Sequence, residues 1–307
     1  MNVSNPSALA ALSADLAAAV ASSGASVLYV DAHPRRDASG IAWDAHHVVT
    51  VDHAIEREDD IELLQDGGAT ARARLVGRDA STDVAVLRTE ATLTPARRAD
   101  PATLAVGNLV LAVARDEDGV PGASFGIVSS LDGPWRTWRG GEIDRFIRPD
   151  VNVYSSFSGG PLVDVAGGVV GMNTWGLSRR MALTLPAPTL DRIVAQLQSG
   201  GRVQRGYLGV ALQAVRLPDA LRAAHGLAQR GGAIVVDVAE NGPAERAGVT
   251  IGDVLLALGA QNIEDSDDVQ RALGSASVGT VQPLRIARGG EARELHVTVE
   301  DRPRDDA

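Results

Sequence analysis

Short segments rich in β-branched residues, separated by turns, are the feature that most constrains the fold of this 307-residue chain. In the N-terminal third they occur at 27–30, 40–43, 48–51, 61–64, 71–76 and 84–87. Strands this short, at close and regular spacing, are typical of a β-barrel or a β-sandwich. A second set lies at 109–114, 125–129, 169–173 and 181–185. We therefore expect a mainly β fold that begins with two successive barrels.

Two segments with helical spacing flank these strands. Residues 6–22 are rich in Ala and Leu, and Ser4 or Asn5 can cap the start of an amphipathic helix. Its apolar positions are Leu9, Leu12, Leu16 and Val20. A second helix is predicted at 190–197, where Gly200 and Gly201 form a natural C-terminal stop and linker.

The pattern changes after this linker to strands mixed with short helices. Strand-like runs occupy 208–212, 233–238, 254–258, 281–287 and 295–299, and helical patterns occupy 243–247 and 267–273. About 100 residues of this kind predict a small α+β domain. The length of the whole chain also agrees with two domains.

Composition excludes several functional classes. A net charge of -10 with no basic run argues against nucleic acid as the main partner. The absence of cysteine excludes disulfides, thiolate nucleophiles and cysteine metal sites, and leaves the redox compartment open. No segment is as long and apolar as a membrane span. Residues 1–34 contain no Lys or Arg, and Asp15 interrupts their apolar run, so they do not read as a signal peptide and predict a cytoplasmic protein.

Three local segments carry candidate chemistry. His53 ends a buried-looking strand, Asp83 stands immediately before another, and Ser158 lies in a Gly-rich turn that leads into a third. The order His, Asp, Ser is one in which the same catalytic geometry is known to occur. Ser158 needs a base to take its proton, His53 has the chemistry for that task, and Asp83 can orient the imidazole. Gly159 and Gly160 allow the tight turn that aims backbone amides at a developing oxyanion.

Together these segments resemble the trypsin-like domain of the HtrA/Deg proteases. The resemblance runs from about residue 27 to 197 and rests on the motifs Gly77-Arg78-Asp79-Ala80-Ser81-Thr82-Asp83, Ser158-Gly159-Gly160-Pro161-Leu162-Val163, Gly126-Ile127-Val128-Ser129 and Gly171-Met172-Asn173-Thr174, with Pro186 after the last strand. It implies a chymotrypsin-like double β-barrel with His53, Asp83 and Ser158 as catalytic residues. It also implies that the amides of Ser156 and Ser158 form the oxyanion hole, and that Asn152 lies near the base of the primary specificity pocket.

The C-terminal domain resembles an HtrA PDZ domain. Tyr207, Leu208, Gly209 and Val210, after Gly206, look like its carboxylate-binding loop. The segments 242–249 and 251–255 resemble the helix and strand that follow. The resemblance implies that a peptide C-terminus adds a strand to the sheet edge while backbone amides hold its carboxylate.

One departure affects the expected activity. The family has Gly two positions before the nucleophile, where this chain has Ser156, and a small polar residue where it has Phe157. If the peptide at 156 must adopt a positive φ, a side chain there costs about 1–2 kcal/mol. We expect this to weaken the oxyanion hole without abolishing it.

These observations predict an N-terminal helical segment (1–24), a serine protease domain (25–199), a PDZ domain (200–302) and a tail (303–307). The expected function is ATP-independent endopeptidase activity on unfolded or misfolded proteins, with no metal or organic cofactor. The alternative is a catalytically weak or inactive binding or chaperone-like module. A homo-oligomer is left open, because the trimers of the family use N-terminal aromatic residues and this N-terminus has few.

Other polar and aromatic residues are assigned no function at this point. Asp52 and Asp79 read as solvated charges. The remaining histidines are interpreted as surface or turn residues: His33, His46, His47, His225 and His296. Trp135 and Trp138 are expected to pack within a polar loop rather than to contact substrate.

Overall fold

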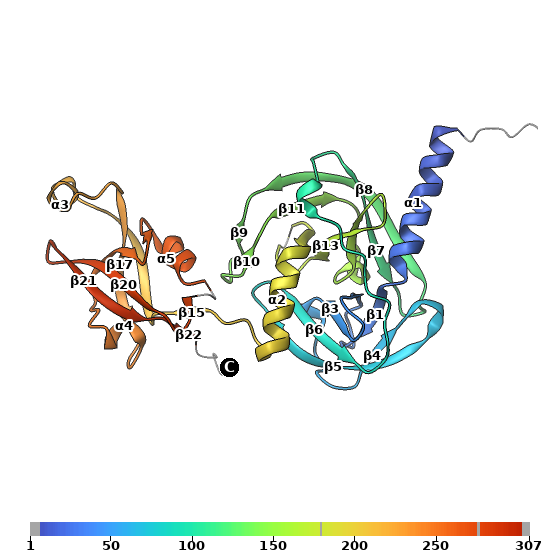
Figure 1. Ribbon diagram of the computed structural model, residues 1–307, viewed down its shortest axis with the longest axis horizontal. Coiled ribbons are helices and arrows are strands. Elements are labelled where there is room, and N and C mark those ends of the chain that lie inside the picture. Colours follow the sequence, from blue (N-terminus) through green and yellow to red (C-terminus); the bar gives the residue numbers. More distant parts are fainter. Residues whose placement is uncertain (1–6, 179, 275–276, 303–307) are drawn as a thin grey trace, which may run out of the picture. The chain divides into compact units, whose positions relative to one another are not determined.

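The computed structural model describes residues 7–178, 180–274 and 277–302, except for the side chain of Ser155. The chain divides into two compact units, Met1–Val203 and Gln204–Ala307, which Figure 1 shows with their elements labelled. Each has its own buried core. Ser4, Asn5 and the expected tail at 303–307 lie outside the described residues.

The first unit begins with a closed β-barrel. Its strands are β1 (Val27–Asp31), β2 (Ala38–Ala42), β3 (His47–Thr50), β4 (Ile61–Leu64), β5 (Thr70–Asp79) and β6 (Val84–Thr89), in the order β1-β2-β3-β6-β5-β4. Alternate residues of β4 and of the first half of β5 are buried, as expected for strands with one face toward a core. Strand β2 is buried throughout.

A second antiparallel sheet of six strands follows in the same unit. It contains β7 (Leu109–Arg115), β8 (Pro121–Asp132), β11 (Phe146–Asp150), β12 (Pro161–Asp164), β13 (Val169–Thr174) and β14 (Leu183–Pro186), in the order β11-β8-β7-β12-β13-β14. The edge strands β11 and β14 contact each other, so the sheet curls into a barrel-like shape. The expected mainly β architecture with two successive barrels is confirmed.

A short ribbon, β9 (Trp135–Arg136) and β10 (Glu142–Ile143), extends from this sheet. Trp135 packs edge-on against Phe146, with ring centroids 5.7 Å apart. Trp138 is 75% exposed and stacks beneath the guanidinium of Arg139. The expected packing role therefore holds for Trp135, whereas Trp138 faces solvent.

Two helices complete the first unit. Helix α1 (Ala8–Gly24) is capped by Ser7, whose hydroxyl accepts the Ala10 amide, so it starts later than the sequence predicted. Leu16 and Val20 pack on the core, but Leu9 and Leu12 are exposed, so only its C-terminal half is amphipathic in the expected way. No helix among the described residues is long and apolar enough to cross a membrane.

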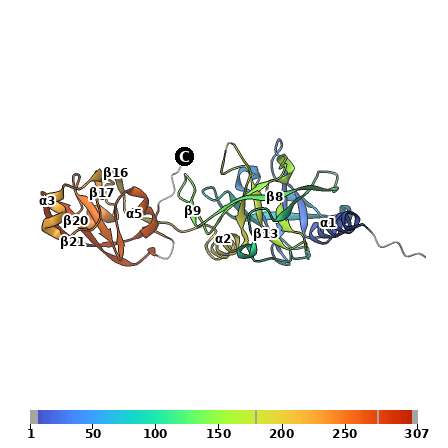
Figure 2. The ribbon, with the colours of Figure 1, turned by 90° about the horizontal axis from the view of Figure 1, so that it is seen from above.

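Helix α2 (Ala187–Gly200) begins directly after Pro186, which has no amide hydrogen to leave unpaired, and ends at Gly201 in a left-handed conformation. It lies against β13, β5 and β6 (Figures 1 and 2). The indole of Trp43 donates to Asp191 on this helix. Helix α2 thus contacts strands of both barrels.

Arg115, at the end of β7, is 1% exposed and ties α1 to the first barrel. Its guanidinium donates to the carbonyl oxygens of Gly24, Val27 and Gly119 at 2.6–2.8 Å. It also lies 3.1 Å from a carboxylate oxygen of Asp66. These partners satisfy the buried cation and also the carbonyl group at the end of α1.

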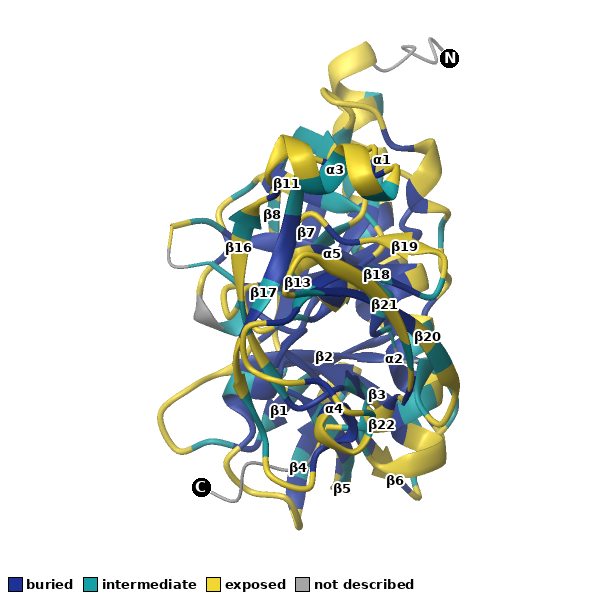
Figure 3. Cartoon of the chain, turned by 90° about the vertical axis from the view of Figure 1, so that its left-hand side faces the viewer, coloured by how far each residue is buried: buried dark blue, intermediate teal, exposed yellow. Residues whose placement is uncertain are grey.

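The second unit is a small α+β domain, in agreement with the sequence. Its strands are β15 (Gly206–Tyr207), β16 (Val210–Arg216), β17 (Gly231–Val238), β18 (Val254–Leu258), β19 (Gln261–Asn262), β20 (Val281–Arg288), β21 (Glu291–Thr298) and β22 (Glu300–Asp301), and its main sheet has the order β16-β17-β18-β20-β21. Its helices are α3 (Asp219–His225), α4 (Pro243–Arg246) and α5 (Ser266–Ala272). Helix α3, which the sequence did not predict, buries none of its residues and is exposed or intermediate throughout (Figure 3).

Candidate active site

His53 and Asp83 are brought together by two paired strands of the first barrel. His53 lies in a short 3₁₀ helix, Asp52–Ala54, directly after β3, and Asp83 stands directly before β6, the neighbour of β3. The imidazole Nδ1 lies 3.0 and 2.9 Å from the two Asp83 carboxylate oxygens. The His53 amide also donates to this carboxylate, at 2.9 Å. Because Nδ1–H faces Asp83, Nε2 remains available to accept a proton.

The carboxylate of Asp83 is held from the second barrel as well. The hydroxyl of Thr174, at the end of β13, donates to it, and the Gly176 amide donates to the Thr174 hydroxyl at 2.8 Å. A Cβ on Gly176 would lie 2.2 Å from the Asp83 carboxylate, so the close approach requires glycine there. Asp83 itself has φ 59°, a left-handed conformation that Asp adopts more readily than most residues.

The turn that contains Ser158 is built by backbone contacts across the two barrels. Ser158 follows a 3₁₀ helix, Ser155–Phe157, and is 2% exposed. Ser39 on β2 donates its amide to the Ser158 carbonyl at 2.9 Å and its hydroxyl to the Ser156 carbonyl at 2.7 Å. Gly159 has φ 84°, and a Cβ there would lie 2.0 Å from the Ser39 carbonyl oxygen. The turn therefore depends on glycine at 159.

Strand β13 connects the Ser158 turn with the His53–Asp83 pair. The Gly159 amide donates to the Asn173 carbonyl at 2.9 Å, and the next residue, Thr174, bonds to Asp83. The three predicted catalytic residues thus belong to one hydrogen-bonded junction between the barrels. Among the described residues, no hydrogen bond joins the Ser158 hydroxyl to His53.

Two further site residues of the sequence analysis lie close to this turn. Ser156 is at the middle of the 3₁₀ helix, a conformation in which φ is negative. Asn152 is exposed in the segment between β11 and this helix. The neighbouring Val153 carbonyl accepts the indole N–H of Trp175 at 2.8 Å. The oxyanion role of Ser156 and the substrate role of Asn152 stay predictions.

The interpretation of Asp52 and Asp79 as solvated charges is wrong, because each is 6% exposed. Asp52 pairs with Arg78, yet burial raises the pKa of its carboxyl above the ordinary value. Asp79 accepts hydrogen bonds from the hydroxyls of Ser81 and Thr82. Both carboxylates brace the segments that carry His53 and Asp83.

Sequence reasoning missed the roles of Thr174 and Ser39. Thr174 occurs in a recognised family motif, but its partner Asp83 is 91 residues away. Ser39 is separated from Ser156 by 117 residues and lies in an unremarkable strand. No local pattern marks either residue, because their partners are defined only by the packing of the barrels.

In the second unit, the loop after β15 has its carbonyl groups engaged. The Leu208 carbonyl accepts the Ala244 amide and the Gly209 carbonyl accepts the Ala239 amide, both at 2.8 Å. Gly209 has φ 75°. No described residue accepts a hydrogen bond from the amides of Leu208 or Gly209. Two backbone donors of this loop are therefore available to an anion.

Apolar side chains lie between this loop, β16 and α5. Leu208, Val269 and Leu273 belong to the buried core of the unit, and Leu212 and Ala272 pack against it while partly exposed. Tyr207 is partly buried in β15, and Val210 begins β16 and pairs with Val238. The loop predicted from the sequence is thus flanked by an apolar wall.

Comparisons with known proteins agree with both units. A model of the trypsin-like peptidase domain matches residues 38–172, and a model of the PDZ domain matches residues 206–299. The solved structure of the HtrA-type protease AlgW with a decapeptide is 25% identical and has a TM-score of 0.77, covering 94% of this chain and 99% of that one. The chain thus has a trypsin-like peptidase domain and a PDZ domain, and it is similar to HtrA-type proteases. The serine endoprotease from Yersinia pestis is similar at 25% identity, with a TM-score of 0.76 and coverage of 93% and 97%.

The curated relatives that this chain matches are longer than the chain. A probable periplasmic serine endoprotease, DegP-like, from Brucella suis is 35% identical over 271 residues, which are 84% of this chain and 51% of the relative. One with the same name from Pseudomonas putida is 33% identical, with 85% and 55% covered. The chain spans about half the length of these relatives.

The periplasmic names of these relatives contradict the cytoplasmic localisation predicted from residues 1–34. That prediction judged only whether the N-terminal residues read as an export signal.

Proposed function

We propose that this HtrA-type chain is a serine endopeptidase that cleaves unfolded or misfolded polypeptides without ATP, outside the cytoplasm. The observation that carries the proposal is the His53–Asp83 pair, with Nδ1 2.9 Å from the carboxylate, joined through β13 to the Gly-rich turn of Ser158. In this proposal each of the three residues has a distinct chemical task.

Ser158 is the nucleophile in this proposal. Its Oγ attacks the carbonyl carbon of the scissile peptide while Nε2 of His53 takes the hydroxyl proton. Asp83 keeps the imidazole in the required tautomer and stabilises the imidazolium. His53 then gives the proton to the leaving amine, and water, activated in the same way, hydrolyses the acyl-enzyme.

The amides of Ser156 and Ser158 are proposed to bind the oxyanion of the tetrahedral intermediate. Loss of one such donor costs about 100- to 1000-fold in rate in other proteases. Ser39 supports this assignment, because its contacts with the carbonyls of Ser156 and Ser158 fix the peptide planes next to these amides.

Cleavage of a reduced, unfolded protein by the wild type and by Ser158→Ala tests the activity. We expect fragments with the wild type and none with the variant. Retention of the intact substrate by both proteins, without cleavage, would instead support the binding or chaperone-like alternative.

We further propose that the second unit binds peptide C-termini at the loop of Tyr207, Leu208, Gly209 and Val210. The available amides of Leu208 and Gly209 support carboxylate capture, and the apolar wall of Val269 and Ala272 supports burial of the terminal side chain. Titration of the full-length Ser158→Ala chain with a peptide that ends in a free carboxylate, and with its C-terminal amide, tests this. Equal affinities for both peptides would rule out carboxylate capture.

A further inference from the structure

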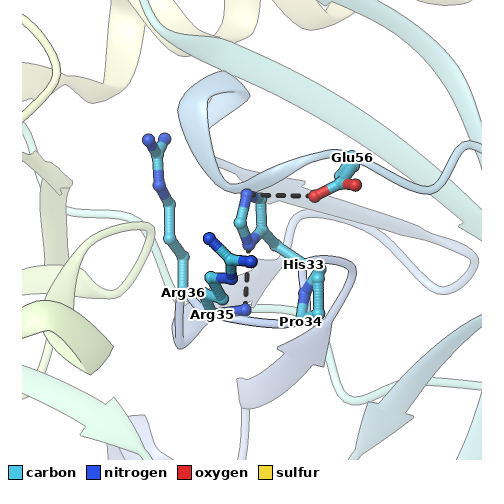
Figure 4. A pocket seen from close by; sticks show the side chains of 5 residues that line it. All are labelled: His33, Pro34, Arg35, Arg36 and Glu56. Atoms are coloured by element: carbon cyan, nitrogen blue, oxygen red, sulfur yellow. Dashed lines mark hydrogen bonds and ion pairs between the residues drawn. The ribbon is translucent and has the colours of Figure 1, made fainter.

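A pocket of about 400 Å³ opens beside the catalytic histidine, on the first barrel. It is lined by His33, Pro34, Arg35 and Arg36, from the connection between β1 and β2, and by Glu56, just after the 3₁₀ helix that carries His53 (Figure 4).

The pocket carries more positive than negative charge. The Arg35 amide donates to Nδ1 of His33 at 3.0 Å, so the ring proton is on Nε2, which lies 3.2 Å from the Glu56 carboxylate. In this tautomer the imidazole is neutral. Of the residues that line the pocket, Glu56 is then the one anion, beside the two guanidinium groups of Arg35 and Arg36. The nearby Asp37 carboxylate accepts the hydroxyl of Tyr29 at 3.1 Å.

The guanidinium groups have donors to spare. No hydrogen bond or ion pair engages the Arg35 side chain among the described residues, and Figure 4 shows it beside His33 in the pocket. Arg36 donates through one nitrogen to the His53 carbonyl at 2.5 Å. Because a guanidinium carries five N–H donors in a planar fork, both side chains can still bind a carboxylate.

The position of the pocket indicates which part of a substrate reaches it. In peptide cleavage His53 gives its proton to the leaving amine, so the polypeptide C-terminal to the cut bond must pass over the His53 side of the site. Arg36 contacts the backbone of His53 directly, and Glu56 follows it by three residues. The pocket therefore lies along the path of the leaving segment.

We propose that this pocket selects substrates with an acidic side chain, Asp or Glu, in the first few residues C-terminal to the cleaved bond. Arg35 binds the carboxylate, and Arg36 adds positive charge while it remains attached to the His53 carbonyl. The proposal rests on the endopeptidase function argued above and specifies its substrate class.

Peptide pairs that differ only in Glu or Gln on the leaving side of one cleavage site test this selection. Amidated C-termini exclude capture by the second unit. We expect the wild type to have about a three- to tenfold higher kcat/KM for the Glu peptide than for the Gln peptide, as for a partly exposed ion pair. This preference should become smaller at high salt, because salt screens the ion pair. Arg35→Glu should reverse it in favour of a Lys peptide. The matched control is Arg88→Glu, an exposed arginine on β6 that pairs with Glu90, and it should keep the wild-type preference.

Binding of the same amidated peptides to the Ser158→Ala chain separates this proposal from the proposed activity. We expect the Ser158→Ala chain to bind the Glu peptide more tightly than the Gln peptide, and the added Arg35→Glu substitution to abolish this difference. That result supports the pocket proposal even if the wild type cleaves nothing and the endopeptidase proposal fails. Equal kcat/KM together with equal Kd for the Glu and Gln peptides would overturn the pocket proposal and leave endopeptidase activity intact.

Discussion

Thr174 is the residue through which the second barrel contacts the carboxylate of Asp83, the proposed partner of the catalytic histidine. Thr174→Val keeps the shape of the side chain but removes the hydroxyl that donates to Asp83. We expect kcat on an unfolded substrate to fall roughly tenfold, the loss of one hydrogen bond to a charged group, because Asp83 then holds His53 less firmly. KM should change little, since Thr174 acts through Asp83.

Thr174→Ser distinguishes positioning from simple stability. It retains the hydroxyl and loses only a buried methyl group, so kcat should recover while the free energy of unfolding remains lower than in the wild type. A kcat of Thr174→Ser as low as that of Thr174→Val would argue against the positioning role.

Ser156 is one of the two residues before Ser158 at which this chain departs from the HtrA pattern, and it lies in a 3₁₀ turn. Glycine reaches positive φ without the cost that a side chain imposes, so it lets the amide at 156 turn toward an oxyanion more easily. We expect Ser156→Gly to raise the cleavage rate several-fold, measured on an unfolded protein substrate. An unchanged or lower rate would mean that serine already presents the amide as required.

Asp253 makes the second unit sensitive to acid. Burial acts to raise the pKa of this fully buried carboxyl, but hydrogen bonds from Arg288 and from the Thr250 amide outweigh it and hold the pKa below the ordinary 3.8. A lowered pKa in the folded state gives stability that is present above the ordinary value and lost as the pH falls through the folded pKa.

Urea denaturation of the full chain between about pH 3 and 7 measures this dependence. We expect the wild type to lose stability below about pH 4, and Asp253→Asn to be less stable at neutral pH but flatter in acid. Asp237→Asn, which changes an exposed aspartate of the same unit, should follow the wild-type curve. If the free energy of unfolding of the wild type depends on pH in the same way as that of Asp253→Asn, Asp253 is not the source of the acid sensitivity.

Among the structural elements, the Gly159 turn makes the most specific demand on sequence. Gly159→Ala combines a positive φ with a Cβ 2.0 Å from the Ser39 carbonyl, whereas Gly107→Ala has a similar φ of 92° and no atom within 4 Å. Backbone strain costs both variants about 1–2 kcal/mol, and the clash should cost Gly159→Ala at least about 2 kcal/mol more. Tryptophan fluorescence follows this unfolding, because all four tryptophans lie in the first unit. Equal destabilisation by the two substitutions would mean that the turn relaxes.

The elements that could be predicted from the sequence are those with strong apolar patterns. Strands β4 and β18 have the predicted bounds, since alternating or continuous apolar runs end there at polar turns. Strand β8 extends beyond the predicted 125–129 in both directions, into Gly- and Ser-containing segments whose pairing with β7 and β11 overrides their weak propensity. Helix α3 was missed because none of its residues is fully buried and only Leu221 packs on an apolar cluster, so the helix has no apolar stripe.

At the scale of the whole molecule, the order of the two units was visible because each has its own pattern of strands and helices. Motif order also predicted His53, Asp83 and Ser158 as the catalytic residues, and the structure brings their segments to one junction between the barrels. The residues that hold this site in place could not be predicted from the sequence, because Ser39 and Thr174 act across the barrels through contacts between distant parts of the chain. Long-range hydrogen bonds leave no local signature, and for the same reason Asp52 was interpreted as solvated although Arg78 pairs with it.

The junction between the barrels also sets how this unit can fluctuate. The amides of Ser39 and Gly159 each donate across it, to the carbonyls of Ser158 and Asn173. Neither amide can exchange its hydrogen with solvent unless the junction opens, so both should exchange at a common, opening-limited rate. If Ser158 and His53 are nucleophile and base as proposed, each opening also separates them, so the protein lacks its catalytic geometry for the fraction of time that the junction is open. If a covalent inhibitor on Ser158 slows hydrogen exchange of both amides by the same factor, the exchange rates of Ser39 and Gly159 report directly how often the junction is closed.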